Sequence, residues 1–322
     1  MTGTTQLPHA VNNFYDRTML ERARSLLVHT NWGQVRDIPK NGTNVIKYRR
    51  YGALATATTP LVEGVTPEGK DLSKTDVSAT VYQYGDFVRL SDWVQLTTLD
   101  PILTETAEVL GEQAGDTLDE LARDVLHTGT NVQYADATTP GSGANRAAVG
   151  STDVLDADEL KVGIRTLKNG NAKRINKMVS ADTGYNTTPV MASFVGIIHP
   201  DATHIIQDLS GFESVEKYAG RTTVLPGEVG KYKDIRFVET TQAKVFAGEG
   251  GGGIDVYSTL ILGMDAYGVS RISGNAMQNI VKPIGSAGSA DPLNQRSTSG
   301  WKATFACVIL NDNFLLRIEH AV

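Results

Sequence analysis

The glycine-rich stretch at residues 248–253 is the first part of this sequence that could carry chemistry, because closely spaced glycines can cradle a phosphate. A phosphate-binding loop of the G-x-x-x-x-G-K-[ST] type needs its lysine to reach the phosphate and its hydroxyl to hold magnesium. Here Ile254 and Asp255 follow the glycines, so both groups are missing. The stretch is therefore predicted to be the mobile tip of a loop.

Other residue types that serve catalysis are present without the spacing that catalysis needs. His199 and His204 are five residues apart, which does not place them on one helical face as an H-E-x-x-H pattern would. The single cysteine, Cys307, lies in an apolar run and is predicted to be a small core residue rather than a nucleophile. No G-x-S-x-G pattern occurs. The sequence therefore predicts no catalytic residue, no cofactor and no metal site.

Length and charge narrow the class of protein. The 322 residues suffice for one large or two modest domains, and their formal net charge is −6. Proteins that hold nucleic acid tightly need a basic footprint, so this charge argues against such a protein but allows one that encloses nucleic acid without adhering to it. A single cysteine rules out an intrachain disulfide framework. No apolar run reaches the roughly 18 residues that span a bilayer, and the first residues lack a secretory signal pattern.

Residues 99–130 predict one long amphipathic helix around which the rest of the chain is organised. Asp100 and Pro101 suit the N-cap and the first turn, and Gly129 suits the end. At about 1.5 Å per residue the helix is on the order of 40 Å long. Apolar residues recur at three- and four-residue steps and are predicted to face inward: Ile102, Leu103, Ala107, Leu110, Ala114, Leu118, Leu121 and Val125. The carboxylates between them are predicted to be solvated: Glu105, Glu108, Glu112, Asp116, Asp119, Glu120 and Asp124.

The residues before this helix predict an arm and a long hairpin that cannot be stable alone. Residues 1–13 are polar and predicted to be disordered, and residues 14–29 predict a short amphipathic helix. Strands are predicted at residues 45–51 and 77–90, with a long polar tip between them. An isolated two-stranded hairpin is marginal in water, and this one has few apolar residues to stabilise it. We therefore expect an extended chain that leans on its neighbours.

The residues that follow Ser151 predict a domain of mixed helices and strands. Asp156 begins a capping-box pattern, with Leu155 before it, for a helix that ends at Asn169 and Gly170. Strands are predicted at residues 194–198, 222–225, 234–239 and 256–262, a turn at 226–233, and a turn and helix at 199–209. At about 110–120 residues this is an ordinary domain size.

The last stretch predicts strands again. They are expected at residues 267–272, 279–284, 301–310 and 313–321, with a flexible loop at 285–300. Trp301, Ala303, Phe305, Cys307 and Ile309 share one face of the third of these strands. Its other face is apolar from Val308 onward, so burial on both sides is predicted there.

The order of these parts resembles that of the tailed-bacteriophage major capsid proteins, whose HK-ninety-seven-like fold is shared with herpesvirus shells and bacterial encapsulins. More specifically, the chain resembles the N-four-like phage major capsid family. The segments that carry the resemblance span nearly the whole chain in the expected order: PLVEGVTPEG at 60–69, QYGDFVRLSD at 83–92, IIHPD at 197–201, PGEVGKYKDIRFVET at 226–240 and DPLNQRSTSGWKATFACVILNDNFLLRIE at 291–319.

This resemblance implies an α+β fold with an N-terminal arm, an E-loop hairpin, a P-domain with a long spine helix and β-sheet, and a mixed α/β A-domain. The implied boundaries are 1–40 for the arm, 41–95 for the E-loop, 96–150 for the P-domain with its spine helix, 151–264 for the A-domain, and 265–322 for the returning P-domain strands and the C-terminal strand.

The function that the resemblance implies is that of a structural major capsid protein, not an enzyme. It would self-assemble into hexamers and pentamers of an icosahedral phage head around double-stranded DNA, without sequence-specific DNA binding and without a membrane. The implied partners are further copies of the chain, a separate scaffolding protein, a portal and, where one exists, a decoration protein. The implied location is the virion capsid, assembled in the host bacterial cytoplasm. Residues expected at contacts between subunits are Arg49, Arg50, Glu63, Glu68, Lys70, Lys74, Tyr15 and Arg17.

Two alternatives remain open from the sequence. The first is an encapsulin-type nanocompartment shell of the same fold, which would enclose protein cargo instead of DNA. The second is a soluble α/β enzyme with an unrecognised site, which would be a small particle with a pocket for a ligand.

Overall fold

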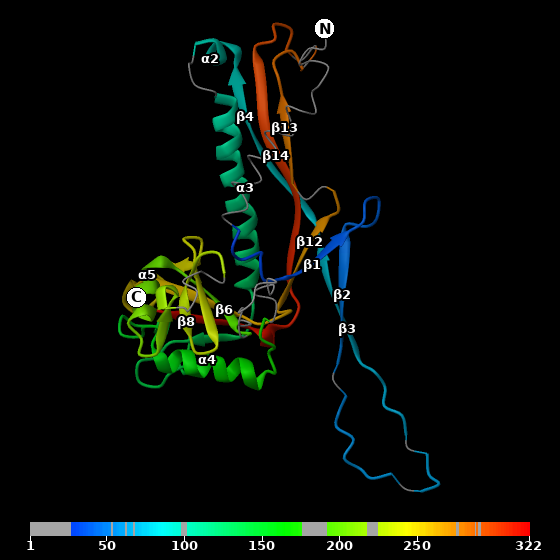
Figure 1. The fold of residues 1–322 in the computed structure, drawn as a ribbon, viewed down its shortest axis with the longest axis vertical. Helices are drawn as coiled ribbons and strands as arrows, with labels where there is room; N and C mark the ends of the chain where they lie inside the picture. Colours follow the sequence, from blue (N-terminus) through cyan, green and yellow to red (C-terminus); the bar gives the residue numbers. More distant parts are fainter. Residues whose placement is uncertain are drawn as a thin grey trace, which may run out of the picture.

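The computed structural model describes residues 27–322 except 53, 62, 67, 98–101, 176–191, 218–224, 275–276, 287 and 289–290. The chain forms three parts (Figure 1): a tall central sheet with a long helix beside it, a compact lobe at the foot of that helix, and a hairpin that projects away from both. Among the described residues, no helix combines the length and the apolar character that crossing a membrane requires.

The central part is built on the strand β14 (Arg296–Ile309), which runs almost its full height. The other strands of this five-stranded sheet are β1 (Gln34–Ile38), β4 (Tyr82–Ser91), β12 (Tyr267–Ile272) and β13 (Met277–Lys282). β14 pairs antiparallel with β4, β12 and β13, and β1 lies parallel to β12. The short helix α2 (Asp92–Thr97) and the long helix α3 (Ile102–Leu126) follow β4. The predicted long helix is therefore present, and it packs against β14.

The buried face of α3 is close to the predicted one but drifts by one residue toward its C-terminal end. Ala107, Leu110, Ala114 and Leu118 are buried as predicted, whereas Ala122 and Leu126 occupy the places expected for Leu121 and Val125, which are only partly covered: Leu121 packs at the margin of the same cluster. A straight helix has 3.6 residues per turn, so a stripe followed over several turns moves forward relative to strict three- and four-residue steps.

Asp119 is a clear exception to the solvated acidic face, because its side chain is fully buried. Its carboxylate accepts hydrogen bonds from the backbone N–H groups of Val28 (2.8 Å) and His29 (2.7 Å), and lies 2.6 Å from Nδ1 of the equally buried His29. The Tyr267 hydroxyl donates to the carbonyl of His29 and accepts from the N–H of Trp32. Residues 27–33, which we call the strap, are thereby fixed across the middle of α3. The helix predicted at residues 14–29 lies outside the described residues up to 26, and residues 27–29 are not helical.

The lobe is an eight-stranded mixed sheet with strand order β5-β15-β11-β6-β9-β8-β7, and β10 pairs with β11. These strands are β5 (Val132–Tyr134), β6 (Phe194–Ile198), β7 (Phe212–Ser214), β8 (Glu228–Tyr232), β9 (Ile235–Glu239), β10 (Val245–Phe246), β11 (Val256–Leu262) and β15 (Leu315–His320). The helices are α4 (Ala157–Asn169) and α5 (Pro200–Gln207), and single 3-10 turns lie at Arg146–Ala148, Val215–Lys217, Gly251–Gly253 and Asp312–Phe314.

Both faces of this sheet are covered. Apolar residues of α4 and α5 pack on one face, against Phe194, Phe237 and Ile318 among others. Residues of the other face, such as Val195 and Leu260, join α3 and β14 in one continuous core. The lobe and the central part are therefore held together by shared apolar burial.

The predicted start of α4 is confirmed, since the Asp156 side chain accepts hydrogen bonds from the N–H groups of Asp158 (3.0 Å) and Glu159 (2.7 Å). Glu159 does not return a capping bond. It is buried, and it accepts from the N–H groups of Asp136 and Gly141, which fixes the loop before the helix.

The sequence predicted a turn at residues 226–233, and this prediction is wrong. These residues contain β8, which pairs with β9 through a tight connection at Lys233, whose φ is 49°. The strand predicted at residues 222–225 lies outside the described residues except for Leu225, which is in no strand.

The predicted hairpin is present, but its second strand is divided. β2 (Val45–Tyr51) pairs antiparallel with β3 (Lys74–Thr80) alone. Val81 separates β3 from β4, and β4 belongs to the central sheet. The base of the hairpin is buried through Ala79 and Val81 against Ile38 and Ala306.

Near the end of the chain, the flexible loop predicted at residues 285–300 is shorter than expected, because β14 already begins at Arg296. Burial on both faces occurs at Ala303–Ala306 and not from Val308 onward, where exposure is intermediate. Residues 303–306 lie between the core of α3 and the base of the hairpin, whereas Cys307 and Val308 pack only at the margins of these two clusters.

Candidate functional site: surfaces that can meet another copy

The basic residues singled out on the hairpin lie together on its paired strands. Arg49 Nε is 3.2 Å from one oxygen of Asp76, and Lys74 Nζ is 3.2 Å from the other. Desolvation acts to raise the pKa of Asp76, but the hydrogen bonds from Lys74 and Arg49 outweigh it and lower that pKa. Arg50 is exposed and has no ion pair among the described residues. These cations therefore form an exposed ladder along the hairpin.

The acidic candidates lie elsewhere, in the long connection between β2 and β3. Glu63 and Glu68 are exposed, and Lys70 donates to the carbonyl of Ala55 across the loop at 2.8 Å. Residues 52–73 carry three carboxylates against one lysine, so this part of the hairpin, which we call the tip, is acidic. The structure does not bring Glu63 or Glu68 near the basic ladder. Tyr15 and Arg17 lie outside the described residues.

Large apolar side chains at the tip are the feature that sequence reasoning missed. Four aliphatic residues of this loop are between 55% and 79% exposed: Leu54, Leu61, Val65 and Leu72. Because the tip projects away from the rest of the chain (Figure 1), no other described element covers them. Exposed apolar side chains gathered on one loop make the tip a candidate interaction surface. The sequence signal was present in the spacing of these residues within an otherwise polar loop.

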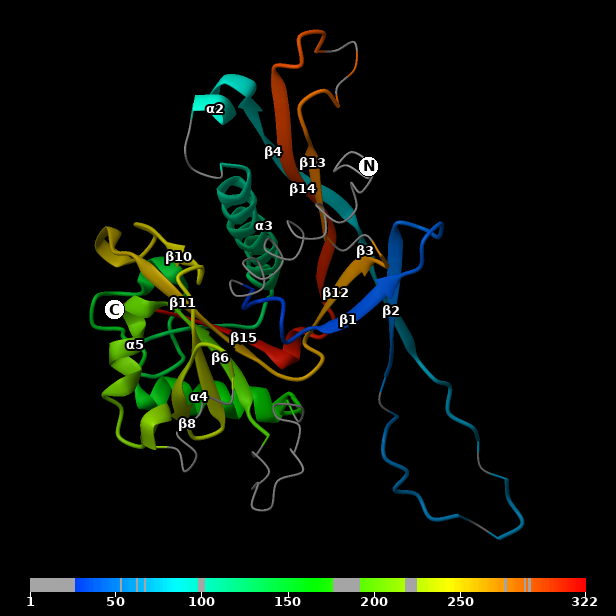
Figure 2. The ribbon, with the colours of Figure 1, turned by 45° about the horizontal axis from the view of Figure 1, so that its top comes forward.

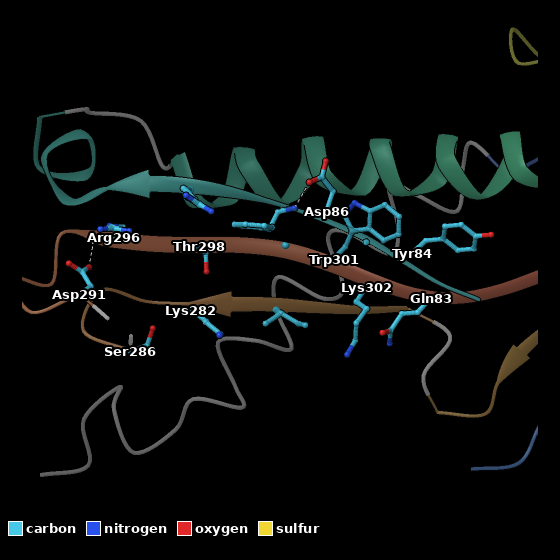
Figure 3. A pocket seen from close by; sticks show the side chains of 15 residues that line it. Gln83, Tyr84, Asp86, Lys282, Ser286, Asp291, Arg296, Thr298, Trp301 and Lys302 are labelled. Atoms are coloured by element: carbon cyan, nitrogen blue, oxygen red, sulfur yellow. Dashed lines mark hydrogen bonds between the residues drawn. The ribbon is translucent and has the colours of Figure 1, made fainter. Parts of the chain in front are cut away.

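A groove of about 670 Å³ runs along β4, β14 and β13, at the end of the molecule far from the tip. Figure 3 shows Lys282 and Lys302 pointing away from α3, whereas Asp86 points toward it. Side chains alternate between the two faces of a strand, and directly opposed residues of paired strands share a face. Trp301, whose indole N–H donates to Gln113 of α3 at 3.1 Å, marks the face toward the helix.

The opposite face carries the groove and is basic. Its cations come from three strands, and none has an ion pair with a carboxylate of the described residues: Arg89, Lys282, Arg296 and Lys302. Phe87 and Ile280 lie between them, 53% and 39% exposed. Gly300 is needed beneath them, because a Cβ there would come within 2.6 Å of the Cβ of Phe87. The groove therefore offers cations around a half-exposed apolar floor.

Two further surfaces are open to a partner. A cleft of about 640 Å³ lies at the base of the hairpin, where Arg36 stacks on Tyr48 and where Arg50 and Lys173 also line the wall. At the far end of the central sheet, Trp93 and Leu96 of α2 are 71% and 77% exposed. The first surface is basic and the second is apolar.

The two histidines and the cysteine considered for chemistry are not assembled into one site. His199 caps α5 by accepting from the N–H of Asp201 at 3.2 Å, while His204 is exposed on the same helix. Burial raises the pKa of the Cys307 thiol to about 12, which keeps it protonated and unreactive. Across the described part of the chain, no group of three or more His, Cys, Asp or Glu side chains is placed to hold a metal ion.

The glycine-rich stretch is held against the lobe and does not stand as a free tip. Gly251 N donates to the carbonyl of Val149 at 2.8 Å, and Glu249 pairs with Arg146. Gly248 N donates to Asp255, the residue that stands where a phosphate-binding loop would need a hydroxyl.

The fold is similar to that of solved bacteriophage capsids. The capsid of Ralstonia phage GP4 matches with a TM-score of 0.67 at 13% identity, covering 89% of this chain and 87% of that one. The head of Helicobacter pylori bacteriophage KHP40 matches with a TM-score of 0.63 at 13% identity, over 92% and 89%. The capsid of cyanophage Pam1 matches with a TM-score of 0.60 at 14% identity, over 93% and 92%. No family model and no curated protein sequence matches the chain.

These matches cover about nine tenths of this chain and of each solved chain, so the similarity is one of the overall fold. The chain therefore has the HK-ninety-seven-like fold of tailed-phage shell proteins, and the predicted α+β fold class is confirmed. The assignment to the N-four-like family stays a prediction.

Proposed function

We propose that this chain is the major capsid protein of a tailed bacteriophage, a structural protein that assembles with copies of itself into an icosahedral head. The similarity of fold to solved phage capsids supports this function. One observation on the chain itself carries the proposal: an acidic, apolar tip and a basic groove with an apolar floor lie at opposite ends of one molecule.

The positions of the tip and the groove at opposite ends of the molecule determine how two copies can make contact. The tip is directed away from the groove of its own chain, so the two can meet only between different copies. Such a contact joins different surfaces on the two partners, and repetition of a heterologous contact closes into a ring when the rotation allows it. Rings of five and six subunits are the pentamers and hexamers of the proposed shell. The contact itself consists of Glu63, Glu68 and the apolar tip residues on the cations and floor of the groove.

We propose that Arg49, Arg50 and Lys74, which lie on the strands next to the tip, also contact the neighbouring subunit. Lys70, within the tip, is proposed as a further contact. Tyr15 and Arg17 are proposed as contacts of the arm. The proposed parts are the arm (1–40), the E-loop (41–95), the P-domain with the spine helix (96–150), the A-domain (151–264), and the returning P-domain strands with the C-terminal strand (265–322). The hairpin buries little apolar area within its own chain, so a neighbour supplies the burial that orders it.

The proposed location is the virion capsid, with assembly in the host bacterial cytoplasm. The head encloses double-stranded DNA, and the net charge of −6 disfavours adhesion of the shell to that DNA. Further proposed partners are a separate scaffolding protein, a portal and a decoration protein.

Sedimentation velocity of the purified chain, with negative-stain imaging of any fast fraction, tests the proposal. We expect rings or shells, formed alone or after a scaffolding partner is added. The variant Arg89→Glu/Lys302→Glu should raise the concentration needed for assembly about tenfold, because it places like charges opposite the tip. Adding Glu63→Lys/Glu68→Lys to the same chain should restore much of the loss. Lys231→Glu, on the lobe, is the matched control and should assemble normally.

A chain that stays monomeric at every concentration, with and without a scaffolding partner, would contradict the shell function. Shells that enclose a specific protein cargo, and no DNA during infection, would instead favour the encapsulin-type compartment. A small stable particle that binds a ligand would point to the enzyme alternative.

A further inference from the structure

Arg146 occupies an unusual position in the lobe, since its guanidinium contacts three separate segments. Nε and Nη2 bind the two carboxylate oxygens of Glu319 on β15, at 2.6 and 2.9 Å. Nη1 binds Glu249 of the glycine-rich loop. The guanidinium carbon lies 3.3 Å from the centre of the Phe246 ring, on β10. One side chain thus connects the C-terminal strand, β10 and the loop at residues 247–253.

The two carboxylates that Arg146 binds differ in their surroundings. Glu319 is fully buried and also lies 2.8 Å from Nε of Arg317. Removing one partner from a buried, bidentate pair leaves an uncompensated charge and is strongly destabilising. Glu249 is 53% exposed, and an ion pair to a solvated carboxylate contributes little to stability. The Glu319 end of this arrangement is therefore permanent, and the Glu249 end is easily released.

The loop itself has the freedom to move once it is released. Gly248, Gly252 and Gly253 have φ values of 68°, 75° and 82°, and no atom lies within 4 Å of a Cβ built at Gly252 or Gly253. Besides the Glu249 ion pair, three backbone N–H groups hold the loop: Gly251 donates to the Val149 carbonyl, Gly248 to the Asp255 carboxylate and Gly250 to the Ile254 carbonyl. Figure 2 shows β10 and the loop that follows it at the edge of the lobe on the side away from the hairpin.

We propose that Arg146 is a clamp with one fixed and one releasable end, and that release of Glu249 lets residues 247–253 adopt a second position while β15 stays in place. This inference rests on the proposed function for its purpose. Identical chains in rings of five and six have unlike neighbours at the same residues, so a shell subunit needs a segment that adapts without disturbing the fold. A solvated ion pair and a few backbone hydrogen bonds, over glycines with positive φ, provide that segment.

Hydrogen exchange measured by mass spectrometry on the unassembled subunit tests the clamp. Glu249→Gln keeps the size of the side chain and removes its charge. We expect exchange in the peptide that covers residues 247–255 to become about three- to fivefold faster, with β15 and residues 146–149 unchanged. Raising the salt concentration to 1 M should produce a similar increase in the wild type and almost none in Glu249→Gln. Glu213→Gln, an exposed carboxylate of β7, is the matched control and should leave the loop unchanged.

Two results would overturn the clamp: unchanged exchange of the loop in Glu249→Gln, or equal acceleration of β15, which would show that both ends open together. The adaptive role of the clamp is tested by the same hydrogen-exchange measurement on assembled shells, where the loop peptide should show two exchange populations. One population, identical to that of the free subunit, would reject the adaptive role. If the wild type forms no shells at all, the proposed function fails, while the measurement on the free subunit still decides whether the clamp exists.

Discussion

The lobe and the hairpin are made from the same chain and meet their need for burial in opposite ways. Eight strands and two helices of the lobe cover one another, and even its charged residues are paired inside: Glu228 with Arg236, and Glu319 with Arg146 and Arg317. The hairpin has two paired strands, and its apolar tip residues remain in solvent. The difference is that the described part of the lobe buries its apolar residues within one molecule, whereas the tip of the hairpin leaves its own in solvent.

Deleting residues 59–74 should have the largest effect of all, and it should act on assembly and not on folding. The tip buries nothing in its own chain, so the variant should unfold at nearly the wild-type temperature. Assembly should be abolished, because the proposed contact with the groove is gone. Thermal unfolding and sedimentation velocity measure the two effects. Intact shells from this variant would show that the tip is dispensable.

Asp119→Asn should have the next largest effect, and on the folded body instead of on assembly. The substitution leaves the buried His29 and two backbone N–H groups with a poorer acceptor, which should lower the free energy of unfolding by about 2–4 kcal/mol. Asp116→Asn is the matched control on the same helix. Burial, and then the neighbouring Asp119 carboxylate, raises the pKa of Asp116, so neutralising it should change stability by less than about 0.5 kcal/mol.

Denaturant titrations of both variants measure these changes, and hydrogen exchange of Val28 and His29 reports on the strap directly. Equal stability of the two variants would mean that the strap is not held by Asp119.

The free energy of unfolding should also depend on pH, because of the partly buried His127 beside the lobe. Burial lowers the pKa of His127 to about 3, even though its hydrogen bond to the Arg123 carbonyl opposes this. The unfolded chain, with an ordinary histidine pKa, therefore binds the proton first as the pH falls below about 6.5. Stability should decrease from pH 6.5 toward pH 3, by on the order of 2–4 kcal/mol for this group. His127→Gln should flatten that dependence, and His204→Gln, on the exposed face of α5, should not. Parallel pH profiles for all three proteins would contradict this account.

Substitutions in α2, at the apolar end of the central sheet, should have the smallest effect on assembly. Trp93→Ser/Leu96→Ser removes two exposed side chains that no described residue covers, so the melting temperature should stay within about 2 °C of the wild type. If this end meets other subunits, assembly should need about two- to fivefold more protein. Light scattering against concentration makes the comparison. A wild-type assembly curve would assign this surface to a different partner.

Several strands of the lobe, the central sheet and the hairpin could be predicted from local sequence. The expected strands at 45–51, 194–198, 256–262 and 267–272 have the bounds that the structure gives. In each of these segments, β-branched and aromatic residues stand between turn residues, and this pattern is local. The start of α4 at Asp156 was predictable for the same reason, because its cap lies within three residues of it.

What could not be predicted depends on residues far apart in the sequence. No glycine or proline marks the break at Val81, and only pairing with β2 on one side and β14 on the other separates β3 from β4. Asp119 looked like one more solvated carboxylate, because its partner His29 is 90 residues away. The groove is assembled from alternate residues of three strands, so no single stretch of sequence shows its charge.

The length of β14 has a mechanical consequence. Residues Arg296–Phe305 of this strand lie opposite β4, while β13 and β12 pair with it along the other edge. A pull along the axis of β14 loads these hydrogen bonds in shear, all at once, whereas a pull on the ends of the β2–β3 hairpin opens its bonds one pair at a time. The same molecule thus contains a stiff rod and a compliant strip. In a shell built as proposed, tension would therefore extend the hairpins that connect neighbouring subunits first, and the central sheet of each subunit would keep its shape.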